Sequence, residues 1–521
     1  MVDTKEVPER KARGPSDFTK VTRGALASLS GTAVGMIATL VTAVLLIRTL
    51  GVDGYGRLAL AVAVVTVVQG LSGLGLPNGA ARMLAFARAK KDEAGFRRML
   101  KASIFVGLAA GTTGAVLIIS LRWFGVIERF GSFEVLAVAS LLLLTSGVRS
   151  SLYGALRALQ DVRALLKLSV TVPLIDVTTV GLLVFLGVRE IIWYVGILVV
   201  AAYLEVGMLI FLSRRRGRTY GSLFDTTWAD AKALLSFSFP FVLVQFMFLA
   251  IHQADVVILG AFHPPSTLGL YTPVMRLGQT VEKVLSAFPV LYVPIATAYF
   301  AQSRIADIHN LYLTVSKWAY GVAFTIVLTI FVAPDVVLPI LFGGPYQGMV
   351  TEARILAIGY WAMLATGLNG VTLGAMGLQK RAAAVAGVAV VANLAVGLLL
   401  IPPFAAAGAA WSNTITYVLV NVAYSVVLYR ASGISPFRRD TTSLFLYSLV
   451  VLGIGLAATE LLDLRSTIQS IGLMMAIALT WVLGVAFGRP FKMEWGDMKE
   501  AFLIRGKGRN ARESARQNGA A

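Results

Sequence analysis

Apolar residues recur along the chain in runs of about 20, separated by shorter polar stretches. Each run is long enough to cross the hydrocarbon core of a bilayer as a helix, and lipid offers the backbone of such a segment no other partner. The pattern therefore predicts an all-α integral membrane protein with about fourteen transmembrane helices. Their expected limits are 24–47, 58–78, 102–121, 133–153, 168–187, 191–212, 236–259, 269–297, 316–337, 352–374, 383–401, 405–428, 442–460 and 467–487.

The longer polar stretches group these helices into lobes. A short sequence repeat supports the grouping: residues 154–163 precede Asp176 much as residues 374–381 precede Asn393, and Gly-Leu-Leu follows in both places. We expect two six-helix lobes in a parallel pseudo-repeat, an arrangement typical of transporters. The predicted order is a basic N-terminus (1–23), an N-lobe with helices 1–6 (24–212), a linker (213–235), a C-lobe with helices 7–12 (236–428), a second linker with accessory helices 13 and 14 (429–487), and a basic tail (488–521).

Composition and charge agree with a membrane location. The chain is 57% hydrophobic and 14% charged, which excludes a soluble enzyme, a disordered chain and a disulfide-linked secreted scaffold. The formal charge of +19 follows from topology, because the loops on the side of the N-terminus hold 35 of the 46 lysines and arginines. This bias is the positive-inside rule and predicts a multi-pass protein of the cell (plasma or inner) membrane with both termini cytoplasmic. No nucleic-acid partner is needed to explain it.

Signatures of catalysis and of cofactors are missing from the sequence. With no cysteine and three scattered histidines, we expect no metal site and no cofactor. There is no Gly-x-x-x-x-Gly-Lys-Ser/Thr phosphate loop and no soluble domain for a catalytic site. Loops on the outer side have about 3 to 14 residues, too few to hold a sugar chain outside the membrane. We therefore predict a carrier, not an enzyme.

The eighth predicted helix places several polar groups at membrane depth, where a charge costs about 2.5–3.5 kcal/mol on insertion scales. Arg276, Gln279 and Lys283 share one helical face, with Glu282 beside Lys283. Asp255 on the preceding helix lies at a depth similar to that of Arg276. Two interpretations stay open: a structural ion pair between Asp255 and Arg276, or a cationic stripe that faces a wet cavity and receives an anionic group. Arginine suits phosphate, because its planar fork binds two oxygens.

Four further charged residues have two interpretations each. Arg48 and Arg57 flank the first outer loop, where they either extend toward lipid headgroups or belong to the cationic cavity. Asp176 and Glu205 are acids within predicted helices five and six. They either bind a coupling cation or proton, or pair with a basic neighbour such as Arg149.

Small and amide residues within the helices indicate helix packing. We interpret four asparagines as hydrogen-bond partners between helices: Asn369, Asn393, Asn413 and Asn421. Two glycine pairs with the spacing Gly-x-x-x-Gly predict close helix contacts: Gly31 with Gly35, and Gly107 with Gly111.

Three stretches make the chain resemble a known family. The first is Ile47-Arg-Thr-Leu-Gly-Val-Asp-Gly-Tyr-Gly-Arg57, continued by residues 73–82. The second is Ala254-Asp-Val-Val-Ile-Leu-Gly260, followed by residues 268–271. The third is residues 393–412, with an Asn, an apolar run, Ile-Pro and then Gly-Ala-Ala. They resemble the polysaccharide-type flippases of the multidrug/oligosaccharidyl-lipid/polysaccharide exporter superfamily.

The resemblance implies movement of a polyprenyl-diphosphate-linked oligosaccharide from the cytoplasmic to the outer leaflet by alternating access, for cell-surface polysaccharide. Asp255 matches the acidic position of the family's helix-seven stretch, whereas Arg276 and Lys283 depend on the periodicity argument alone. Membrane lipid surrounds such a protein, and contact with other membrane proteins of polysaccharide assembly stays open. The motifs of the peptidoglycan-precursor branch are absent, and residues 24–47 lack the acid usual in the drug-extruding branch.

Two alternative functions remain. An ion-coupled exporter of amphipathic drugs would depend on the buried acids, and an intramembrane enzyme of glycan assembly would yield a new covalent product.

Overall fold

A computed structural model describes residues 15–159, 161–214, 227–461 and 467–487. The predicted tail (488–521), most of the basic N-terminus (1–23) and the middle of the first linker (213–235) lie outside the described residues. Within them the chain forms sixteen α-helices and two 3₁₀ segments, and no strand. The elements are α1 (Pro15–Ser72), α2 (Leu76–Ala89), α3 (Glu93–Trp123), η1 (Glu128–Phe130), α4 (Phe133–Ala158), α5 (Val162–Phe185), α6 (Ile191–Arg214), α7 (Trp228–Phe262), α8 (Pro265–Leu285), α9 (Pro289–Ala301), α10 (Ile305–Val332), α11 (Pro334–Phe342), η3 (Gly344–Met349), α12 (Val350–Thr366), α13 (Asn369–Ala375), α14 (Gln379–Ser432), α15 (Arg439–Leu461) and α16 (Thr467–Phe487).

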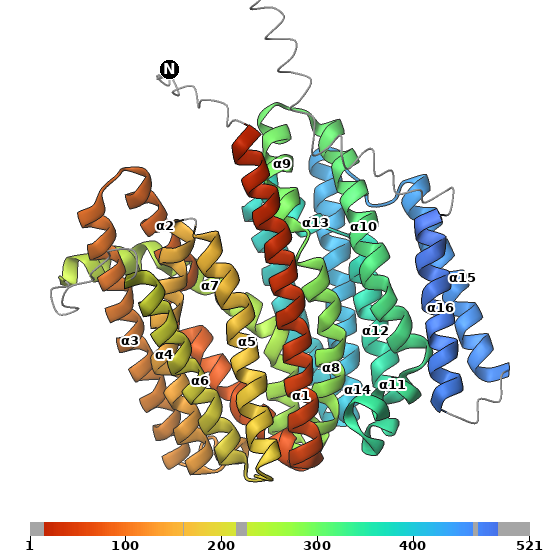
Figure 1. The fold of residues 1–521 in the computed structure, drawn as a ribbon, viewed down its shortest axis with the longest axis horizontal. Helices are drawn as coiled ribbons and strands as arrows, with labels where there is room; N and C mark the ends of the chain where they lie inside the picture. The colour runs from red at the N-terminus through yellow and green to blue at the C-terminus, as the bar shows by residue number, and fades with distance from the viewer. Residues whose placement is uncertain (1–14, 160, 215–226, 462–466, 488–521) are drawn as a thin grey trace, which may run out of the picture.

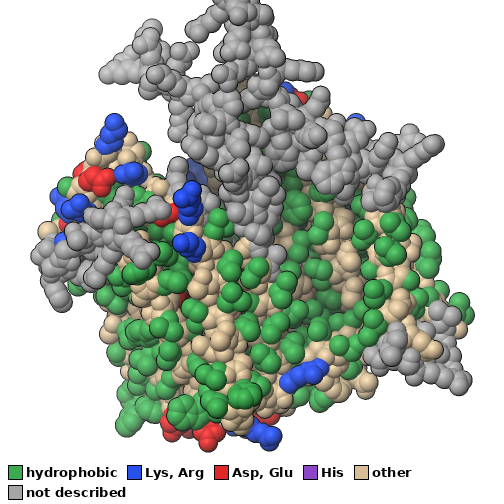
Figure 2. All heavy atoms as spheres, viewed as in Figure 1, with side chains coloured by type: hydrophobic (Ala, Val, Ile, Leu, Met, Phe, Trp, Pro, Cys, Tyr) green, Lys and Arg blue, Asp and Glu red, His purple; other side chains and the backbone are tan. Residues whose placement is uncertain are grey.

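Length and composition confirm an all-α multi-pass membrane protein. Among the described residues, nine helices are long and apolar enough to cross a membrane. Exposed apolar side chains cover the flanks of the molecule, and charged side chains gather toward its two ends (Figure 2). Examples on five helices are Leu117, Leu182, Val200, Val388 and Leu479. Such a surface suits contact with lipid chains.

Two of the predicted outer loops are sharp kinks. The first and second predicted spans join in α1 at Gly51, where φ is +68°. A glycine tolerates this conformation because it has no Cβ. The eleventh and twelfth spans join in α14 at Ala405, directly after Pro402 and Pro403, which cannot donate backbone hydrogen bonds.

Four other predicted spans are each divided into two helices. Span 58–78 breaks between α1 and α2, where Leu74 and Gly75 have positive φ, and span 352–374 breaks at Gly367 for the same reason. In span 269–297, α8 ends at Leu285 and α9 follows it. In span 316–337, α10 ends at Val332 and α11 follows it. Both new helices begin with a proline, a residue that starts a helix more readily than it continues one.

The helices form two groups with α1 between them, as Figure 1 shows. Helices α2–α6 lie on one side, α8–α14 on the other, and α15 with α16 form the far edge. Equivalent spans pack in equivalent pairs: the first span of α1 contacts α5 through Gly31 and Gly35, and α7 contacts the first span of α14, where Gly397 meets Ile258. These pairs agree with a parallel repeat, while the lobe boundaries stay a prediction.

The two ends of the helix bundle need names. The basic end, at the top of Figure 1, carries the turn between α2 and α3 and those between α4 and α5 and between α9 and α10. The opposite end carries the kink at Gly51, the segment 124–132, the turn 263–264 and η3.

The accessory helices are fixed to α10. Trp481 of α16 is fully buried, and its Nε1 donates to the Gly321 carbonyl at 2.9 Å. The hydroxyls of Tyr320 and Ser448 lie 2.7 Å apart and connect α10 with α15. The polar atoms of Trp481 and Tyr320 thus have hydrogen-bond partners within the protein, which lipid chains could not provide.

Glycines set the crossing of α3 and α4. A Cβ at Gly147 would lie 2.3 Å from the Gly107 Cα, and one at Gly111 would lie 2.3 Å from the Leu143 carbonyl oxygen. No side chain fits in this space, so the two backbones approach directly. The predicted contact through Gly107 and Gly111 is confirmed, and Gly147 supplies its other face.

We expect Gly147→Ala to push α3 and α4 apart and to lower the free energy of unfolding by about 1–3 kcal/mol, the usual effect of overpacking. Gly196→Ala on α6 is the matched control, because nothing lies within 4 Å of a Cβ there. The midpoint of thermal unfolding of the purified protein in detergent measures both. Equal midpoints for the two variants would contradict the crossing described here.

Candidate functional site

A pocket of about 220 Å³ lies between the two groups of helices. Both spans of α1, with α5, α6 and α8, supply its walls. Its polar lining consists of Thr39, Thr42, Tyr55, Asp176 and Arg276. The central pocket, as we call this space, thus brings one half-buried acid and one half-buried base to the same cavity from different groups of helices.

Arg276 is the base in this pocket. Its side chain is half-buried, and its Nε has no hydrogen-bond partner among the described residues. Buried polar atoms are hydrogen-bonded with few exceptions, so an unpartnered guanidinium nitrogen in a cavity wall needs an explanation. A planar donor group that is not bonded to the protein is free in geometry to bind two oxygens of an anion.

The ion pair between Asp255 and Arg276, one of the two interpretations of the sequence, is not formed in the described part of the chain. The Asp255 Oδ2 instead accepts from the Tyr271 hydroxyl at 2.6 Å and from the Asn413 Nδ2 at 2.8 Å. Asn413 also contacts the Tyr271 oxygen at 2.8 Å. Neutral donors from α8 and α14 therefore hold this buried carboxylate, and Arg276 is left to the pocket.

The other α8 residues that the sequence singled out with Arg276 are half-buried but do not line the central pocket. These are Gln279, Glu282 and Lys283. The Glu282 Oε2 lies 3.2 Å from His252 Nε2 on α7. Arg276 and Glu282 are the charged groups that act on Lys283. The cationic stripe beyond Arg276 stays a prediction.

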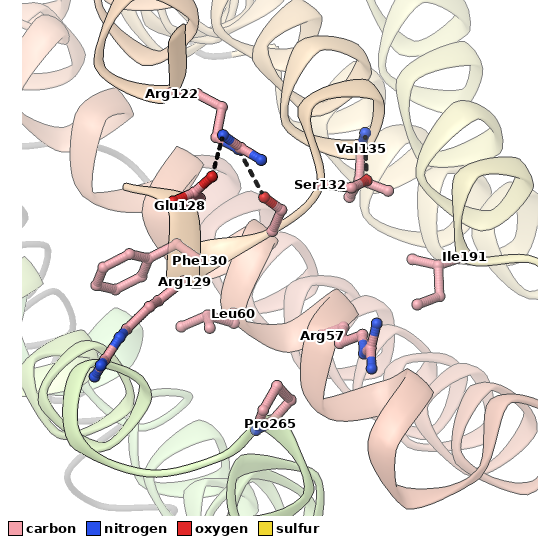
Figure 3. Close-up of a pocket in the computed structure, with 11 residues that line it drawn as sticks. Arg57, Leu60, Arg122, Glu128, Arg129, Phe130, Ser132, Val135, Ile191 and Pro265 are labelled. Atoms are coloured by element: carbon pink, nitrogen blue, oxygen red, sulfur yellow. Dashed lines mark hydrogen bonds and ion pairs between the residues drawn. The ribbon is translucent and has the colours of Figure 1, made fainter. Parts of the chain in front are cut away.

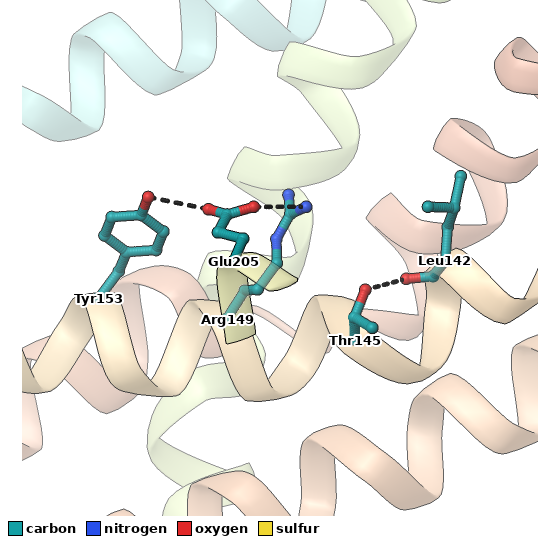
Figure 4. Close-up of polar contacts among 5 residues, drawn as sticks. All are labelled: Leu142, Thr145, Arg149, Tyr153 and Glu205. Carbon is teal, nitrogen blue, oxygen red and sulfur yellow. Dashed lines mark hydrogen bonds and ion pairs between the residues drawn. The ribbon is translucent and has the colours of Figure 1, made fainter. Parts of the chain in front are cut away.

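The two acids of the first group of helices differ in their surroundings. Figure 4 shows Glu205 of α6 between two residues of α4: Arg149 Nη1 lies 3.0 Å from its Oε2, and the Tyr153 hydroxyl donates to its Oε1 at 2.8 Å. Glu205 is thus in the pair with Arg149 that the sequence allowed. Asp176 forms no such pair within the described part of the chain, and it lines the central pocket together with Arg276.

Arg48 and Arg57 lie at the opposite end, outside the central pocket. Arg48 donates through Nε to the Leu341 carbonyl at 3.1 Å and through Nη2 to the Ile340 carbonyl. These carbonyls belong to the last turn of α11, where backbone oxygens lack helical partners. Arg57 pairs with Asp53 at 2.9 Å and lines a second pocket, drawn in Figure 3.

The two groups of helices touch backbone to backbone at the opposite end. A Cβ at Gly56 would lie 1.8 Å from the Pro265 carbonyl oxygen, and one at Gly269 would lie 1.8 Å from that of Val52. The Tyr346 hydroxyl donates to the Gly269 carbonyl at 2.7 Å. We call this contact the seam.

The predicted asparagine contacts are confirmed by their bonds between helices. Asn393 donates to the Thr416 hydroxyl at 3.0 Å, and Asn369 donates to the Asn421 carbonyl at 2.9 Å. The sequence did not single out Tyr271 as a partner of Asp255. The signal that could have found Tyr271 is its place in the helical hairpin that also holds the acid Asp255. Asn413 is too distant in sequence to be paired with Asp255 from the sequence alone.

Comparison with known proteins adds the family. A family model described as polysaccharide biosynthesis protein matches residues 21–300, more than half of the chain. None of the curated proteins matches.

Solved structures share the fold at low sequence identity. Lipid II flippase MurJ in an inward closed conformation has a TM-score of 0.66 at 13% identity, over 89% of this chain and 98% of that one. An inward-facing multidrug resistance MATE family transporter has a TM-score of 0.66 at 13% identity, over 78% and 98%. An outward-facing one reaches 0.57 at 13% identity, over 80% and 95%.

With an all-α multi-pass fold and a family match over residues 21–300, the chain belongs to the polysaccharide biosynthesis protein family, and its sequence resembles the polysaccharide-type branch of the multidrug/oligosaccharidyl-lipid/polysaccharide exporter superfamily.

Proposed function

We propose that the protein is a flippase that moves a polyprenyl-diphosphate-linked oligosaccharide from the cytoplasmic to the outer leaflet by alternating access. The observation that carries this proposal is the unpartnered Arg276 Nε in the central pocket. The family match and the fold shared with a lipid II flippase support the class of substrate.

The central pocket suits a diphosphate group. Arg276 offers a charged fork that can donate to two oxygens. The hydroxyls of Thr39 and Thr42 donate to carbonyls of their own helix, at 2.7 and 2.9 Å, so each would have to rotate before it could donate to an anion. The apolar lining, with Leu46, Leu58 and Leu198, agrees with a lipid carrier chain nearby.

The charge distribution supports the proposed direction. We take the basic end as cytoplasmic by the positive-inside rule, with both termini on that side. The seam then closes the outer side, and the substrate enters from the cytoplasmic leaflet. The higher TM-score against the inward-facing transporter, 0.66 compared with 0.57 for the outward-facing one, agrees with this assignment. The protein performs no covalent chemistry in this scheme.

We expect Arg276→Gln to abolish polysaccharide export while the protein still inserts. Loss of charge-assisted hydrogen bonds of about 1.5–3 kcal/mol corresponds to roughly 10- to 100-fold weaker substrate binding. Arg276→Lys keeps the charge but not the planar fork, so its export should lie between that of the unchanged protein and that of Arg276→Gln. The measurement is the sidedness of the lipid-linked oligosaccharide in cells that carry each variant, with the exposed Arg189→Gln as control. Normal sidedness in Arg276→Gln would refute the proposal.

Ion-coupled drug export is the second candidate, because two acids lie in the first group of helices and the fold is shared with MATE transporters. It predicts that Asp176→Asn and Glu205→Gln are the damaging changes and that they remove resistance to amphipathic cations. A flippase should tolerate Asp176→Asn, since the carboxylate opposes an anionic substrate. Drug-susceptibility assays beside the export assay separate the two functions.

The seam gives a further prediction. Gly269→Ala places a methyl group against the Val52 carbonyl, so we expect the seam to open and the central pocket to become accessible from outside. The chain has no cysteine, so Ala59→Cys, which lines that pocket, is a clean reporter for a membrane-impermeant maleimide. Gly348→Ala is the control, with nothing within 4 Å of its Cβ. Unchanged labelling in Gly269→Ala would show that the seam is not the outer gate.

A further inference from the structure

The opposite end has few cations, yet most of those on or beside its described loops converge on one place. These basic residues are Arg48, Arg57, Arg122, Arg129 and Arg189. Three of these, Arg57, Arg122 and Arg129, line a pocket of about 270 Å³ beside the seam. Figure 3 shows Arg57 and Arg129 on either side of Leu60, with Pro265 of the other group of helices between them.

The present partners of these arginines are weak. Arg57 pairs with Asp53 at 2.9 Å, but both side chains are more than half exposed. Arg122 lies 3.6 Å from Glu128, whose side chain is 70% exposed, and its Nε donates to the Gly131 carbonyl at 3.1 Å, a bond that leaves its other nitrogens for a ligand. Pairs between solvent-exposed charges contribute little. A diphosphate carries several charges and many acceptor oxygens, so it binds guanidinium groups better than either carboxylate does.

Arg129 connects the pocket to the gate. Its Nη1 donates to the Ala261 carbonyl at 3.3 Å, in the last turn of α7 and four residues before Pro265 of the seam. An anion that draws Arg129 into the pocket removes this bond. A ligand that binds better when the bond is broken shifts the population toward an open seam.

We infer that the outer pocket of Arg57, Arg122 and Arg129 is an exit site for the diphosphate of the lipid-linked substrate, and that its occupation releases Arg129 from Ala261 and favours opening of the seam. The inference rests on the proposed function for the ligand class and for the side of the membrane. Three guanidinium groups match a diphosphate, with its several charges, better than the single charge of a phospholipid phosphodiester.

The experiment uses inorganic diphosphate as the probe and Ala59→Cys as the reporter, in spheroplasts that expose the outer side. We expect diphosphate to raise maleimide labelling about fivefold or more, compared with sodium chloride at equal ionic strength. The combined variant Arg57→Gln, Arg122→Gln and Arg129→Gln should lose the response. Arg129→Gln alone should raise basal labelling, because the bond to Ala261 is gone. Arg189→Gln, at the same end but outside the pocket, should respond normally.

Three outcomes would overturn the inference. In the first, diphosphate has no effect on labelling. In the second, the combined variant elutes as a folded protein and still responds to diphosphate. In the third, phosphatidylglycerol in phosphatidylcholine vesicles opens the seam and diphosphate adds nothing, so the pocket takes a phospholipid headgroup. Arg276→Gln should keep the labelling response even though it loses export. Normal export in Arg276→Gln with a preserved response would therefore refute the proposed substrate path and leave the outer anion site standing.

Discussion

Direct contact between backbones at the seam determines most of what surrounds it. Gly56 meets the Pro265 carbonyl and Gly269 meets that of Val52 with no side chain between them. This approach places the second span of α1 against α8, so that Arg276 faces residues of α1 and α5 across a small enclosed space. It also brings Arg129 within reach of α7. A bulkier residue at either glycine would separate the walls of the central pocket as well as the seam.

The chain accommodates its buried charges in distinct ways. Neutral hydroxyl and amide donors hold Asp255, and a base with a tyrosine holds Glu205. Arg354 donates to the Phe331 carbonyl near the end of α10, much as Arg48 uses the end of α11. These bonds satisfy part of each charged group within the protein, as a low-dielectric surrounding demands. The Asp255 Oδ1 and the Arg276 Nε both lack a partner among the described residues, but only Arg276 lines the central pocket.

Hydropathy predicted the helices well, because lipid enforces one solution for every apolar run. It could not locate the breaks, which depend on single residues such as Gly51 and Gly367 that also occur inside straight helices. At the site, helical periodicity placed Arg276 at membrane depth but not its surroundings. The choice between a pair with Asp255 and a place in a cavity depended on Asn413, which is 158 residues from Asp255 and reaches it only through the tertiary fold.

The kink at Gly51 leaves the connection between the first two spans without any slack. The two spans are separate helices that meet at Gly51, the single residue of α1 with non-helical torsions. A flexible loop would let each span tilt on its own. Here a tilt of the first span, which packs on α5, is passed to the second, which forms the seam with α8. The backbone torsions of Gly51 thus couple the position of the pocket wall, on the first span, to that of the seam, on the second.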